Sequence, residues 1–122
     1  MDSILTSIKK ILGITEEYEH FDPDLIMHIN TVFSILNQLG VGPKSPFSIQ
    51  DKTATWNDFI QDNDKIEMVK SYMGLKVKLL FDPPLQSSVI ESMNKLISEL
   101  EFRLNVACDT EEIQNGGTDD DT

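Results

Sequence analysis

Two consecutive prolines, Pro83 and Pro84, separate the two longest helical patterns of the chain. Residues 69–84 read VKSYMGLKVKLLFDPP, so the prolines follow directly on apolar residues at helical spacing. Because proline lacks a backbone N–H and pushes the preceding residue out of helical geometry, the helix cannot continue through Asp82. A new helical pattern begins near Ser88, which forms a capping box with Glu91. The break therefore predicts two antiparallel helices joined by a tight corner.

Apolar residues at helical spacing occur in four segments of the chain. These segments are 3–12, 22–39, 64–81 and 88–106. The last has an unbroken apolar face from Val89 to Leu104, and we expect the apolar faces of the last three helices to form one shared core. Asp22 and Pro23 suit the N-cap and first position of the second helix. Gly13 and Gly40 suit the ends of the first two helices. Gly74 lies inside the third helix at a cost of about 1 kcal/mol relative to alanine, which suggests that another helix approaches closely there.

The segment 40–55, GVGPKSPFSIQDKTAT, has no helical period and is interrupted by Gly42, Pro43 and Pro46. We expect an exposed loop, which is long for a compact domain; such loops are usually functional or mobile. Thr55 is then expected to cap a short helical turn, WNDFIQD, with Asp58 three residues on in the capping-box position.

The 122 residues carry a net charge of −11, and six of the acidic residues lie in residues 109–122, which contain no basic residue. Few apolar residues and high charge are typical of disorder. We therefore expect a mainly α fold: a small helical bundle with an antiparallel helical hairpin and a long loop over residues 1–108. A disordered acidic C-terminal tail over residues 109–122 would follow.

No constellation of residues suggests catalysis, a cofactor or a metal site. The only histidines, His20 and His28, fall in an acidic linker and on a polar helix side, as surface histidines do. Three alternating aspartates partly match a calcium loop but lack its glycine and its bidentate glutamate; they are Asp58, Asp62 and Asp64. We expect no enzyme.

The charge and the apolar content of the chain also exclude other classes. Its lysines are too scattered for phosphate binding, and an acidic surface would let DNA pass without holding it. Cys108 is the single cysteine, so neither a disulfide framework nor a thiolate zinc site can form within one chain. The N-terminus has no signal-peptide pattern and no apolar run is long enough to span a membrane, so we expect synthesis in the cytoplasm.

Four apolar residues outside the long helices are candidates for contact with another molecule. Phe47 and Ile49 lie on the long loop with no evident helix to join, which favours an intermolecular contact. Trp56 and Phe59 lie on the short turn. We expect these two to cover the core, and the alternative is that they anchor a partner, because tryptophan is enriched at interface hot spots.

An ordered set of segments resembles the small head–tail connector (adaptor, or head-completion) proteins of long-tailed bacteriophages. They are FDPDLIMHINTVFSILNQLGVGP, TATWNDFI, VKSYMGLKVKLLFDPP and SMNKLISELEFRLN. The resemblance covers roughly residues 3–106. It implies a mainly helical subunit of a ring, usually of twelve copies, beneath the portal in the virion neck. A head-closure (stopper) or tail completion protein would attach below, and DNA would pass through the ring without sequence-specific binding.

The same resemblance implies that residues 98–122 form an arm facing the portal. Within this arm Glu101, Arg103 and Asn105 are the expected contact residues, and the loop 40–55 would contact a neighbouring subunit or the next ring.

Two other hypotheses are open on the sequence alone. One is a small cytoplasmic regulatory module that binds another protein through Trp56 and its surroundings and stays monomeric or dimeric. The other, more remote, is an enzyme with active sites shared between subunits, which would depend on His20 and His28.

Overall fold

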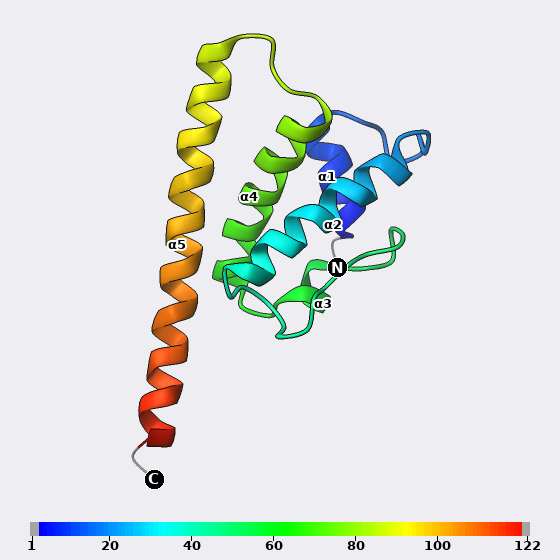
Figure 1. The fold of residues 1–122 in the computed structure, drawn as a ribbon. Coiled ribbons are helices and arrows are strands. Elements are labelled where there is room, and N and C mark those ends of the chain that lie inside the picture. Colours follow the sequence, from blue (N-terminus) through cyan, green and yellow to red (C-terminus); the bar gives the residue numbers. More distant parts are fainter. Residues whose placement is uncertain (1–2, 121–122) are drawn as a thin grey trace.

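The computed structural model describes the backbone of residues 3–120 and the side chains of residues 3–108. Five helices occur in this part of the chain (Figure 1): α1 Ile4–Leu12, α2 Asp22–Gln38, α3 Trp56–Phe59, α4 Asn63–Phe81 and α5 Ser87–Asp120. The mainly α fold predicted from the sequence is confirmed.

Helix α4 occupies the centre of the bundle. It packs against α1 and α2 on one flank and against α5 on the other, and α1 also contacts α2. Figure 1 shows α5 running antiparallel to α4 and continuing well past the far end of the bundle. The predicted helical hairpin is therefore present, and α5 is the outermost helix of the molecule.

The ends of α1 follow the sequence signals. The Ser3 side chain accepts a hydrogen bond from the Thr6 backbone N–H at 3.2 Å, and Gly13 closes the helix in the left-handed conformation, with φ at 79°. Helix α2 differs by one residue from the prediction. Asp22 is its first helical residue and Phe21 is the cap, so Asp22 acts through its negative charge in the first turn and provides no side-chain cap.

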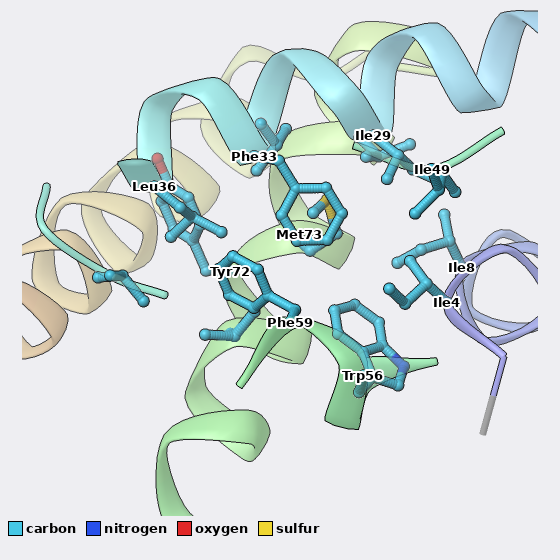
Figure 2. Packing of buried hydrophobic residues seen from close by; sticks show 14 of the residues in the cluster. Ile4, Ile8, Ile29, Phe33, Leu36, Ile49, Trp56, Phe59, Tyr72 and Met73 are labelled. Atoms are coloured by element: carbon cyan, nitrogen blue, oxygen red, sulfur yellow. The ribbon is translucent and has the colours of Figure 1, made fainter. Parts of the chain in front are cut away.

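The core is a single cluster to which every helix contributes. Figure 2 shows Ile4 and Ile8 of α1 facing Trp56 of α3, while Phe33 of α2 lies over Met73 of α4. The close approach predicted at Gly74 is also confirmed. A Cβ atom placed there would lie only 3.1 Å from Cδ1 of Ile11, so this glycine lets α1 pack tightly on α4.

The loop between α2 and α3 contributes to this core, contrary to the expectation of an exposed loop whose apolar residues have no helix to join. Val41 and Ile49 are buried. The end of the loop is held on α1, because the Ile4 N–H donates to the Ala54 carbonyl at 3.0 Å and Ser3 bridges to Thr55. The predicted capping box of Thr55 and Asp58 then starts α3.

The C-terminal helix is longer than predicted. The sequence suggested an end near residue 106 and a disordered tail over residues 109–122, whereas the backbone of α5 continues as helix to Asp120. That residues 109–122 form a disordered tail in solution stays a prediction. The division of the chain into a helical domain and a tail at residue 108 stays a prediction as well.

Candidate assembly surface

Ile49 is held inside the bundle by Asn30 of α2. The Asn30 side-chain amide donates to the Ile49 carbonyl at 2.9 Å, and its oxygen accepts from the Ile49 N–H at 2.8 Å. The Ile49 side chain is only 2% exposed. This burial accounts for the apolar residue at position 49 within a single subunit, and a role for it in contact with another molecule stays a prediction.

Phe47 is half-buried in a cluster of three aromatic rings. Its ring centroid lies 5.0 Å from that of Phe33 and 5.3 Å from that of Phe59. The third pair, Phe33 and Phe59, is separated by 4.7 Å. Phe47 therefore has an intramolecular partner on α2, a contact that local sequence patterns could not reveal. Its contact with another molecule stays a prediction.

Trp56 and Phe59 lie in the core, as the favoured interpretation of the sequence had it. Trp56 is 2% exposed, and its indole N–H donates to the Ser7 hydroxyl at 3.1 Å. Phe59 lies against Gly42, whose φ is +91°, and a Cβ atom at Gly42 would overlap the Phe59 ring. Contact with a partner through these two rings stays a prediction.

The three contact residues expected on α5 have different environments. Glu101 accepts a hydrogen bond from the Tyr72 hydroxyl at 2.6 Å, and Asn105 donates to the Leu39 carbonyl at 3.1 Å. Both side chains therefore attach α5 to the bundle. Arg103 is exposed and forms an ion pair with Glu99 one turn earlier, at 2.6 Å. Of the three, Arg103 is the one that faces solvent, and partner contacts by all three stay predictions.

Tyr72 is a fully buried hydroxyl group beside a carboxylate. Burial, together with the hydrogen bond to Glu101 and the charge of that group, raises the pKa of Tyr72 far above its ordinary value. The phenol therefore stays protonated and donates, and it forms a polar contact between α4 and α5.

Helix α5 packs on the bundle through its residues 97–104. Within residues 87–108 of this helix, whose side chains the structure describes, the buried apolar residues are Ile97, Leu100 and Leu104, and residues 87–96 contribute none. The sequence predicted one unbroken apolar face from Val89 to Leu104 that belongs to the core. That prediction is wrong for Val89 and Leu96, which are exposed, because α4 covers only the middle of α5.

The exposed residues Val89 and Leu96 and the partly covered Met93 between them are separated by four and three positions, the spacing of a coiled-coil face. We call these three residues the seam. Val89 and Leu96 are 38% and 45% exposed, and Met93 is half-buried. The preceding connection adds Leu85, whose side chain is completely exposed.

A second exposed apolar group lies further along α5 and was missed in the sequence analysis. Phe102 is 70% exposed and Val106 is 43% exposed. Their separation of four residues places them on one side of the helix, away from the buried face. We call these two residues the outer pair. A helical projection could have found them, since they interrupt the charged face that contains Lys95 and Glu99.

Among the residues whose side chains are described, no cluster of His, Cys, Asp or Glu could hold a metal ion. None of the described helices combines the length and apolar character that a membrane span requires.

The fold and these surfaces define a class: a small helical subunit with a projecting helix that carries uncovered apolar residues. Comparison with known families agrees with this class and identifies the family within it. The family model described as phage connector protein matches residues 4–111, and the chain belongs to that family. No curated protein and no solved structure matches the chain.

Proposed function

We propose that this phage connector protein is a subunit of the ring that joins the portal to the head-closure or tail completion protein in the virion neck. The match to the connector family over residues 4–111 carries this proposal. As the sequence resemblance implies, the ring would contain about twelve copies and extend the channel through which DNA leaves the head.

The distribution of apolar surface supports an assembling subunit. Single exposed apolar side chains are common on proteins, but exposed apolar side chains that lie together on one element mark contact surfaces. Four of them, Val89, Leu96, Phe102 and Val106, lie on α5, and Leu85 lies on the connection that precedes it.

The charge supports a channel through which DNA moves. The chain carries 21 acidic and 10 basic residues. Negative charge repels the phosphate backbone, so DNA would slide past such a surface without being held by it. The ring would therefore contact DNA without recognising its sequence.

The direct test is to mix the purified chain with portal rings of the same phage. Light scattering after size exclusion and negative-stain images should show a second ring, with a central hole, stacked on the portal. If the chain neither forms rings nor binds the portal at high concentration, the proposal is wrong.

The regulatory alternative loses its main support in the structure. That hypothesis used Trp56 as the anchor for a partner, and this side chain is buried with its N–H bonded to Ser7. A module of that kind would stay monomeric or dimeric and would not associate with particles, so the same experiment distinguishes the two functions.

A further inference from the structure

We propose that neighbouring copies contact each other through α5, with the outer pair of one copy packing on the seam of the next. This inference rests on the proposed function, because it names the contact that would join the copies within the ring. The occupant of the seam is thus α5 of a second copy of this chain.

The seam continues an interface that is already present within the subunit. Leu100, which packs on α4, follows Leu96 at the same coiled-coil spacing that joins Val89, Met93 and Leu96. The face of α5 that packs on α4 thus extends without interruption into residues that α4 does not cover. An occupant that continues this packing would be another helix, because coiled-coil spacing matches a helix surface.

The outer pair supplies a matching apolar surface on the same helix. Consecutive residues of a helix are separated by about 100°, so Phe102 and Val106 lie roughly 110° around the axis from Val89 and Leu96. The ion pair of Glu99 and Arg103 lies between the two groups. One helix therefore carries two separate apolar surfaces that point in different directions.

Two different surfaces are what a ring requires. A closed ring uses a heterologous contact, in which one surface of each copy meets another surface of its neighbour. A two-fold dimer needs only one self-complementary surface, and it would leave the other apolar group exposed. The presence of both groups on α5 therefore favours a ring of copies over a dimer.

The size of the contact predicts how the ring forms. A standard interface buries about 800 Å² on each partner, and the five side chains of the seam and outer pair provide less. Each contact should therefore be weak in isolation, with closure of the ring supplying the additional stability. We expect monomers at low concentration and larger species as concentration rises or when a portal is present.

The test uses two complementary double variants. Phe102→Ser with Val106→Ser removes the outer pair, and Val89→Ser with Leu96→Ser removes the seam. All four side chains are exposed, so circular dichroism should show unchanged helicity and melting. Sedimentation over a range of concentrations, with and without portal rings, should show at least tenfold weaker association for each variant alone.

An equal mixture of the two variants gives the sharper result. One intact seam and one intact outer pair remain, so the mixture should form heterodimers that grow no further. As a control, Met27→Ser with Leu80→Ser removes exposed apolar side chains outside α5 and should assemble like the wild type.

The outcomes separate this inference from the proposed function. If either α5 variant assembles as the wild type does, or the mixture forms no dimer even at the highest concentrations reached, the α5 contact is wrong and the connector function stands. If the wild-type chain also fails to associate with itself and with the portal, both are wrong.

Discussion

Asn30 on α2 forms a reciprocal pair of hydrogen bonds with the backbone of Ile49, at 2.9 and 2.8 Å, 19 residues further along the chain. The asparagine amide thus satisfies one backbone N–H and one carbonyl, as the next strand would in a sheet. Residues 40–55 contain no regular secondary structure, so this pair replaces a ladder of backbone hydrogen bonds and fixes the path of the loop.

Removal of this amide should release the loop. We expect Asn30→Ala to lower the free energy of unfolding by about 1–3 kcal/mol, because both backbone groups of Ile49 lose their partner in a partly buried site. Chemical denaturation measures the change. Asn37→Ala is the matched control: its amide makes longer bonds to Pro43 and Lys44 at the surface, and it should cost less. Equal effects would contradict a special role for Asn30.

The burial of Ile49 leads to a second prediction. Ile49→Ala should destabilise the subunit by about 2–5 kcal/mol, as truncation of a buried isoleucine does in other cores. Leu85→Ala removes a fully exposed side chain and should leave the melting temperature unchanged. A stable Ile49→Ala variant with weaker assembly would instead return this residue to the interface expected from the sequence.

Gly42 should tolerate alanine less well than Gly40 does. Both residues have positive φ, where a side chain costs about 1–2 kcal/mol. A Cβ atom at Gly40 meets nothing, whereas one at Gly42 meets the Phe59 ring, which adds about 1–3 kcal/mol for overpacking. Thermal melting of the two variants gives the comparison. Similar losses would mean that the Phe59 ring moves aside freely.

Lys9 is a buried cation, and its neighbour Lys10 is exposed. The Lys9 ammonium lies 2.9 Å from an Asp22 carboxylate oxygen and donates to the Glu16 carbonyl at 2.8 Å, so it joins α1, the following linker and α2. Lys9→Met should lower the free energy of unfolding by about 2–3 kcal/mol, which is at or just below the usual cost of breaking a buried ion pair. The loss is moderate because the Asp22 carboxylate left behind is partly exposed to water and lies in the first turn of α2, where the helix dipole stabilises negative charge.

Lys10→Met tests whether that loss depends on burial. A surface substitution of this kind should change the free energy of unfolding by less than about 0.5 kcal/mol. If the two methionine variants melt alike, the Lys9 ion pair contributes little to stability.

Tyr72 should make stability fall in alkaline solution. Its pKa is raised in the folded state, so the unfolded chain loses this proton first as the pH rises. The stabilisation is complete below the unfolded tyrosine value of about 10 and declines above it. Unfolding measured between pH 8 and 11, in steps, would show the decline. Tyr72→Phe should be less stable by about 1–2 kcal/mol at neutral pH and should show a weaker decline.

The helices were predictable because periodicity and end signals act locally. Gly13, Gly40, the Thr55–Asp58 capping box and the Pro83–Pro84 break all end or begin helices as predicted. The packing of the loop on the core was not predictable, because the Asn30–Ile49 hydrogen bonds join residues that are distant in the sequence. Such bonds produce no pattern in the spacing of neighbouring residues. The exposure of Val89 and Leu96 was missed for a related reason. Periodicity identifies an apolar face but does not say how much of it a neighbouring helix covers.

The two ends of the long loop and its centre are fixed, while the segments between them are exposed. Residues 43–46 and 50–53 lie at the surface on either side of the buried Ile49. Insertions at such exposed positions disturb a fold least. A short peptide tag placed within residues 50–53 would thus leave α5 and the core intact, and a gold-labelled antibody against it would mark the orientation of the subunit in images of whole particles.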